Sequence, residues 1–311
     1  MNQSSSNHAV RGVILGLIPT CLWGSFYVVG RLLYGEDADS FDPLYLTFLR
    51  YLFASFFLLI FLSLTKRTGL LLTALKQDWK WFFWLGATGI VGEGLLQLGA
   101  LQYTTALRCS MLANASPIFT VILAYFFLKE GFSWRKGLGM VIGFAGVTAA
   151  VLLKGGDAYS GAGQASMLPG DLMALASGIA WAAYTVGGTR VEKKYDGTIG
   201  ATCAIFFGTI QLACLLPFAS GKMTLDLGCR LWIGVFYMGV FTGGIAYACW
   251  YAALKYLKAG TLGAFGYLSL AVTLLLSLTV LRESFRWGYI PALGAILFGV
   301  WLMMSPGRKR S

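Results

Sequence analysis

The sequence has few charged residues for a chain of 311. Asp, Glu, Lys and Arg make up 12% of it, whereas a soluble domain carries roughly 25%. So little charge cannot cover the surface of a soluble protein, which excludes a soluble enzyme and a disordered chain. The sequence also has a single histidine, and its six cysteines lack the spacing of a metal or redox site. We therefore expect no bound metal and no cofactor.

Apolar residues and glycine fill most of the chain. The hydrophobic residue types account for 57%, and there are 40 glycines besides. Ten apolar runs are each long enough for a helix to cross a hydrocarbon core of about 30 Å. They cover residues 12–34, 44–64, 81–101, 106–128, 137–153, 170–189, 198–218, 231–254, 259–281 and 288–304. We predict an all-α integral membrane protein with ten transmembrane helices in a lipid bilayer.

The basic residues lie mainly between the apolar runs. Although the formal net charge is +11, this placement indicates membrane topology, and we expect no nucleic-acid partner. With ten crossings both termini lie on one side, where we count 16 Lys and Arg against 7 on the other side. The positive-inside rule then places both termini in the cytoplasm. The predicted location is the plasma (inner) membrane, crossed several times.

The chain contains an internal repeat. Residues 100–134 match residues 253–287 at 11 of 35 positions, including a Glu and a Trp that apolar bias would not align. Each half holds five apolar runs, an odd number, so the two copies must cross the membrane in opposite directions. We therefore predict a first five-helix repeat in residues 1–153 and a second, inverted five-helix repeat in residues 154–311. Inverted repeats are typical of secondary transporters, which hold substrate near the midplane between the halves.

Several local features accompany this repeat. The stretch 100–147 holds a short joint before Ala106, a mid-helix Ser116-Pro117, and Leu128-Lys129-Glu130 ahead of a glycine-rich run. With Trp23-Gly24 and Leu49-Arg50, these features resemble EamA-type transporters, the ten-helix branch of the drug/metabolite transporter superfamily. The resemblance implies a secondary transporter acting as an exporter. It does not select among amino acids, sugars, nucleoside derivatives and drugs.

Glu93 is the clearest polar candidate because it lies near the middle of the third run. An ionisable group at that depth costs at least roughly 2.5–3.5 kcal/mol on insertion scales and is usually functional. Gln97 lies one helical turn further along. Arg50 falls at a similar depth in the second run, so it is the obvious ion-pair partner. Two hypotheses stay open: Glu93 contacts substrate or a coupling proton, or Arg50 and Glu93 form a purely structural pair.

Aromatic side chains recur at helical spacing in the first, sixth and eighth runs. They fit either a cavity lined by rings or ordinary core packing. Asn114 and Tyr267 occupy equivalent positions in the two copies, and Pro117 should kink the helix beside Asn114. Asn114 then either lines a cavity or bonds a neighbouring helix. The predicted substrate-binding residues are Trp23, Tyr27, Glu93, Gln97, Asn114, Trp181, Tyr184, Tyr247, Trp250 and Tyr267.

The leading hypothesis is a secondary transporter of small organic metabolites such as amino acids, not an enzyme. The sequence has no GxxxxGK[ST] motif for ATP. Export of lipophilic cations is the alternative substrate class, because Glu93 and aromatic faces suit a cation. Two other classes are an intramembrane enzyme, which needs a second central catalytic group, and a membrane sensor, which needs a larger extramembrane part. Glycines in 137–146 and 288–299 allow close helix contacts, which favours packing within a monomer over a homodimer seam.

Overall fold

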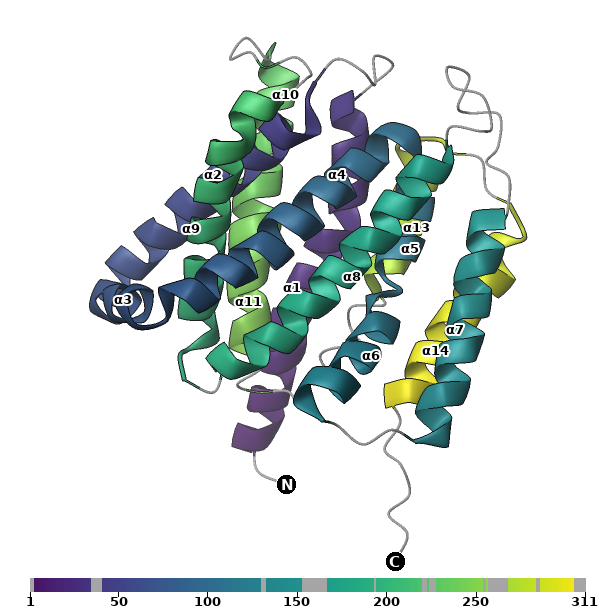
Figure 1. The fold of residues 1–311 in the computed structure, drawn as a ribbon, viewed down its shortest axis with the longest axis horizontal. Coiled ribbons are helices and arrows are strands. Elements are labelled where there is room, and N and C mark those ends of the chain that lie inside the picture. Colours follow the sequence, from purple (N-terminus) through teal and green to yellow (C-terminus); the bar gives the residue numbers. More distant parts are fainter. Residues whose placement is uncertain are drawn as a thin grey trace, which may run out of the picture.

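Figure 1 shows the computed structural model, a bundle of helices. The structure describes residues 3–34, 41–129, 133–152, 167–192, 194–219, 223, 228–253, 256, 268–283 and 286–304. Every regular element in these residues is a helix. The α-helices of the first half are α1 (Gln3–Tyr34), α2 (Pro43–Leu64), α3 (Thr68–Leu85), α4 (Glu93–Tyr103), α5 (Ala106–Ala113), α6 (Ser116–Leu128) and α7 (Trp134–Leu152). Those of the second half are α8 (Met167–Glu192), α9 (Gly197–Leu215), α10 (Gly228–Phe236), α11 (Ala246–Ala253), α13 (Leu268–Thr279) and α14 (Tyr289–Met304).

Six helical stretches are long and apolar enough to cross a membrane. They are Val10–Tyr34, Pro43–Leu64, Ala106–Leu128, Met167–Val191, Gly197–Phe218 and Gly228–Trp250. Two shorter apolar helices, Leu268–Thr279 and Tyr289–Gly299, lie in the last two predicted runs. Several apolar helices of this length make the chain a multi-pass membrane protein. The count of ten crossings and the inversion of the repeat stay predictions.

Two glycine-rich stretches wind as π-helix, η1 (Gly86–Gly92) and η4 (Tyr237–Ile245). Sequence reasoning treated both as ordinary α-helix within the runs 81–101 and 231–254. The shift of 153 residues that relates the two halves carries the last residue of η1 onto the last residue of η4. Glu93 comes directly after η1, and π segments of this kind are frequent at functional sites.

Glycines bring the helices into close contact. A Cβ added to Gly239 in η4 would lie 2.5 Å from the carbonyl oxygen of Arg50, so the two backbones touch. A Cβ on Gly146 in α7 would lie 2.7 Å from the carbonyl oxygen of Ala292 in α14. These glycines therefore pack helices within one chain, and a homodimer stays an untested alternative.

The helix breaks where sequence reasoning expected a kink. Helix α5 ends at Ala113 with Asn114 as its C-cap residue, and α6 begins at Ser116 with a proline in its first turn. The helix is therefore interrupted at the predicted kink. By contrast, α3 already begins at Thr68, so residues before 81 that were left outside the third run are helical. In Figure 1, α1 begins and α14 ends at the same end of the bundle.

Candidate functional site

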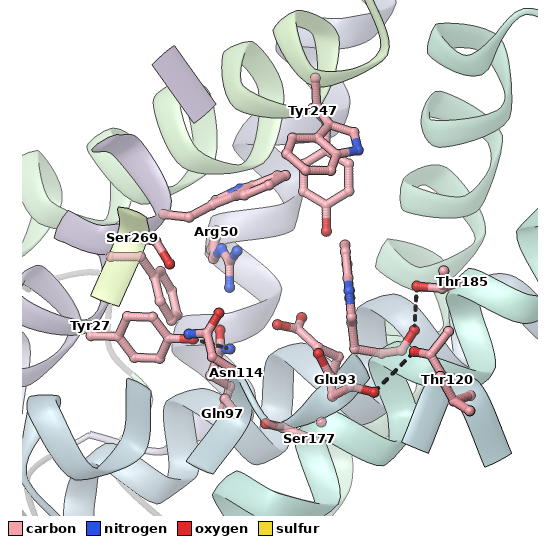
Figure 2. Close-up of a pocket in the computed structure, with 18 residues that line it drawn as sticks. Tyr27, Arg50, Glu93, Gln97, Asn114, Thr120, Ser177, Thr185, Tyr247 and Ser269 are labelled. Carbon is pink, nitrogen blue, oxygen red and sulfur yellow. Dashed lines mark hydrogen bonds between the residues drawn. The ribbon is translucent and has the colours of Figure 1, made fainter. Parts of the chain in front are cut away.

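A cavity of about 340 Å³ lies between the helices of the two halves. Small-molecule sites commonly measure 300–1,000 Å³, roughly speaking, so this volume suits a small metabolite. Nine of the eleven predicted site residues line it: Trp23, Tyr27, Arg50, Glu93, Gln97, Asn114, Trp181, Tyr247 and Trp250. Figure 2 shows these side chains converging from both halves of the chain. That they bind a substrate stays a prediction.

Of the two remaining predicted residues, Tyr184 is not part of the cavity lining. Tyr184 lies behind it, with its ring centroid 5.3 Å from that of Trp181 and its ring against Gly89 of η1. It therefore supports the Trp181 wall. Tyr267 lies outside the described residues. Sequence reasoning missed several lining residues, among them Phe26, Thr120 and Ser269. The apolar or small character of these residues carries no signal of a site.

Four rings form one aromatic wall of the cavity. The ring centroid of Trp23 lies 5.7 Å from that of Tyr247, 5.1 Å from that of Trp250 and 6.4 Å from that of Trp181. These separations are typical of edge-to-face and tilted aromatic pairs. The Trp23 indole also donates a hydrogen bond to the carbonyl oxygen of Thr242 at 3.1 Å, which fixes the ring. The wall combines rings from α1, α8 and α11 into one apolar surface.

The opposite wall carries amide and hydroxyl groups. Gln97 donates a hydrogen bond to the Tyr27 hydroxyl over 3.1 Å. Asn114 donates to the carbonyl oxygen of Ser110 over 2.8 Å, so it bonds its own preceding helical turn. It also faces the cavity (Figure 2). Asn114 therefore lines the cavity and also interacts through its side chain with Tyr27 of the neighbouring helix α1, so the structure is compatible with both expected uses.

Arg50 and Glu93 both reach the cavity, but they do not form the expected ion pair. No ion pair or hydrogen bond joins their side chains in the described part of the chain. The Arg50 guanidinium instead lies over the rings of Phe26 and Tyr51, at 4.3 and 4.6 Å from their centroids. Glu93 accepts a hydrogen bond from the Tyr51 hydroxyl over 3.4 Å. Their similar depth correctly predicted that the two groups lie near one another, since both line one cavity. The guanidinium, however, packs against the rings of Phe26 and Tyr51 and not against the Glu93 carboxylate.

A buried ion pair that sequence reasoning missed joins the two halves beyond the end of the cavity. Arg108 of α5 donates two hydrogen bonds to the carboxylate of Asp171 in α8, one of them at 3.2 Å. Thr104 donates a third over 2.9 Å. Arg108 and Asp171 are 2% and 1% exposed. They are the third and second residues of the apolar runs 106–128 and 170–189, so their positions in the sequence do not mark them as buried.

Glu283 makes a second contact between the halves at the same end. Its carboxylate accepts hydrogen bonds from the backbone amides of Ala106 at 2.8 Å and Leu107 at 3.3 Å. These amides are the free donors of the first turn of α5. Burial raises the pKa of the Glu283 carboxyl above its ordinary value, and the two amide donors oppose that shift. The loop before α14 therefore holds the start of α5.

The opposite end of the bundle is held by ion pairs that are open to solvent. Lys194 donates to Asp78 over 2.6 Å, and Tyr195 donates to the same carboxylate over 2.6 Å. These two hydrogen bonds, led by that of Lys194, lower the pKa of Asp78. Arg67 pairs with Asp196 at 3.2 Å. These ion pairs between the halves are thus buried at one end and partly exposed at the other.

The chain is similar to known transporters, and one family model matches each of its two halves. The sequence model of the EamA-like transporter family matches residues 10–152 and again residues 168–305. An uncharacterized transporter of Archaeoglobus fulgidus is 28% identical over 90% of this chain and 93% of its own. The uncharacterized transporter YdfC of Bacillus subtilis is 30% identical over 90% of this chain and 84% of its own.

Two more distant matches add a named activity and a fold. The aromatic amino acid exporter YddG of Ancylobacter novellus is 25% identical over 70% of this chain and 72% of its own. A solved crystal structure superposes with a TM-score of 0.63 and 20% identity, and covers 94% of this chain and 95% of that one. At this identity the crystal structure indicates a shared fold alone.

Proposed function

Because the chain belongs to the EamA-like transporter family, whose members are transporters and not enzymes, we propose that it exports small organic metabolites such as amino acids. The observation that carries this proposal is the cavity of about 340 Å³, to which both halves contribute rings and hydroxyls and the first half also contributes amides and two opposite charges. Secondary transporters hold substrate at such an interface between repeats. The distant relative named as an aromatic amino acid exporter supports the substrate class.

The proposed architecture is ten crossings arranged as two inverted repeats, residues 1–153 and 154–311. Three observations support it: the family's sequence model matches once in each half, the two π segments end at repeat-equivalent positions, and α1 begins where α14 ends (Figure 1). We place the protein in the plasma (inner) membrane with both termini in the cytoplasm, on the basic-residue distribution.

The proposed transport cycle alternates access to the cavity. In the described conformation the buried contacts of Asp171 and Glu283 join the two halves at one end, which the proposed topology makes the outer end. The inner end is held by the exposed ion pairs of Asp78 and Asp196. Export then requires that substrate enter from the inner end and that the outer contacts break while the inner contacts hold. Glu93 stays the candidate for a coupling proton, as an acid that lines the cavity.

Export of lipophilic cations is the second candidate, favoured by the same acid and by the aromatic wall. Counterflow in proteoliposomes separates the two: vesicles loaded with unlabelled tryptophan should accumulate labelled tryptophan, and empty vesicles without protein should not. Accumulation of a labelled lipophilic cation with no exchange of any amino acid would favour the alternative. If no metabolite or cation exchanges in either assay, the proposed function is wrong.

A further inference from the structure

Arg50 is a buried cation that points into the cavity. Its side chain is 3% exposed, and its head faces the interior in Figure 2. Neither Nε nor Nη1 has a hydrogen-bond partner among the described residues. A guanidinium carries five N–H donors and cannot lose its charge in a protein. A buried charge of this kind is costly until a partner of opposite charge arrives.

The surroundings of Arg50 hold the guanidinium in place without satisfying its donors. The rings of Phe26 and Tyr51 lie 4.3 and 4.6 Å from its Cζ atom. Ring faces attract a cation but accept no strong hydrogen bond, so they leave the N–H groups available. The backbone of η4 packs against the carbonyl oxygen of Arg50 through Gly239. A fixed guanidinium with free donors suits a planar carboxylate, which it can bind through two parallel hydrogen bonds.

Glu93 supplies the opposite charge within the same cavity. It is 8% exposed, and the hydrogen bond that it accepts from Tyr51 is long at 3.4 Å. Tyr51 therefore contacts both charged groups, with its ring beside Arg50 and its hydroxyl at Glu93. Both charged groups face the same cavity (Figure 2), and no ion pair joins them in the described part of the chain.

We propose that Arg50 binds the carboxylate and Glu93 the ammonium group of a single zwitterionic substrate, an α-amino acid with an aromatic or large apolar side chain. A lipophilic cation would pair with Glu93 and leave Arg50 unpaired, and a simple organic acid would do the reverse. A zwitterion is the class that satisfies both charges. The rings of Trp23, Trp181 and Tyr247, with centroids 5.7–6.4 Å apart, offer the surface for its side chain.

This proposal rests on the proposed transport function, and a competition assay on the unmodified protein separates the two. Counterflow of labelled tryptophan is competed by tryptophan itself, by tryptamine, which lacks the carboxylate, and by indole-3-propionate, which lacks the amine. We expect tryptophan to compete at least about tenfold better than either analogue, because each analogue leaves one buried charge unpaired. Equal competition by tryptamine would overturn the role of Arg50 while leaving transport intact. If the wild type exchanges none of the three compounds, the proposed function itself fails.

Variants then assign the carboxylate contact to Arg50. Arg50→Gln should weaken competition by tryptophan by about 30-fold or more, while competition by tryptamine stays the same or improves. Arg50→Lys keeps the charge but loses the planar fork, so its competition by tryptophan should be intermediate between that of the wild type and that of Arg50→Gln. Arg230→Gln is the matched control, because Arg230 is exposed on α10 and does not line the cavity. If Arg50→Gln weakens tryptophan and tryptamine equally, with a melting temperature like that of the control, Arg50 does not recognise the carboxylate.

Discussion

The buried pair of Arg108 and Asp171 gives the sharpest prediction about stability. Asp171→Asn keeps the shape of the side chain but removes its charge. Asp171 now accepts two hydrogen bonds from Arg108 and one from Thr104. In the variant the amide oxygen can still accept from Thr104, but the guanidinium of Arg108 faces a neutral group. Because Arg108 is 2% exposed, water cannot replace the lost carboxylate.

The expected loss follows from that burial. Breaking a buried ion pair by removing one partner costs about 3–5 kcal/mol, since the other charge stays buried without its counter-charge. At about 2–4 °C per kcal/mol for a chain of this general size, the melting temperature should fall by about 6–20 °C. The exposed pair of Lys194 with Asp78 is the contrast. Its loss in Asp78→Asn should cost about 0.2–1 kcal/mol.

Thermal unfolding of the purified protein in detergent measures both variants under the same conditions. The double variant Arg108→Met with Asp171→Leu removes both charges and should recover most of the loss, because no unpaired charge is left behind. A fall of less than about 1 kcal/mol for Asp171→Asn would refute the burial argument. So would a double variant as unstable as the single one.

Four further predictions concern other parts of the molecule. The hydrogen bonds that Asp78 accepts lower its pKa. The stability that they add is therefore present above about pH 4 and is lost as the pH falls through the lowered pKa. Below that pKa, the melting temperatures of the wild type and Asp78→Asn should converge. Gly146→Ala should destabilise the protein because its Cβ meets the α14 backbone, whereas Gly294→Ala, with open space around it, should raise or keep the melting temperature in the same scan. Trp181→Ala should weaken tryptophan exchange, while size-exclusion chromatography shows a folded fraction near that of the wild type. If exchange and folded fraction fell together, the Trp181 ring would be assigned to packing. Glu93→Gln should flatten the pH dependence of exchange rates, and an unchanged profile would remove Glu93 as a coupling group.

The sequence predicted the class of fold because hydrophobic length is a direct consequence of the bilayer. The kink beside Asn114 could also be predicted, because a proline lacks the backbone N–H that a continuous helix needs. The π segments η1 and η4 could not be predicted from periodicity, because both lie inside continuous apolar runs in which the period of the hydrophobic pattern is hard to define. Their glycine-rich composition, GATGIVG and YMGVFTGGI, was the available signal.

The sequence predicted which residues line the cavity better than it predicted the contacts among them. Depth along a helix brought Arg50 and Glu93 to one cavity, but depth does not say which way a side chain turns. The rings of Phe26 and Tyr51 take up the guanidinium, and neither ring had been marked as a partner. The pair of Arg108 and Asp171 depends on the packing of α5 against α8, which no local pattern encodes.

The central claim is that substrate passes through the cavity between the halves, and chemical blocking of that cavity tests it most directly. The six free cysteines are replaced by serine, and Thr120, which lines the cavity, is changed to cysteine. Thr73→Cys, on the exposed surface of α3, is the matched control. A bulky thiol reagent should abolish tryptophan counterflow in the Thr120→Cys protein but not in the control, and added tryptophan should slow the labelling of Thr120→Cys. Complete labelling of Thr120→Cys with unchanged counterflow would contradict the claim.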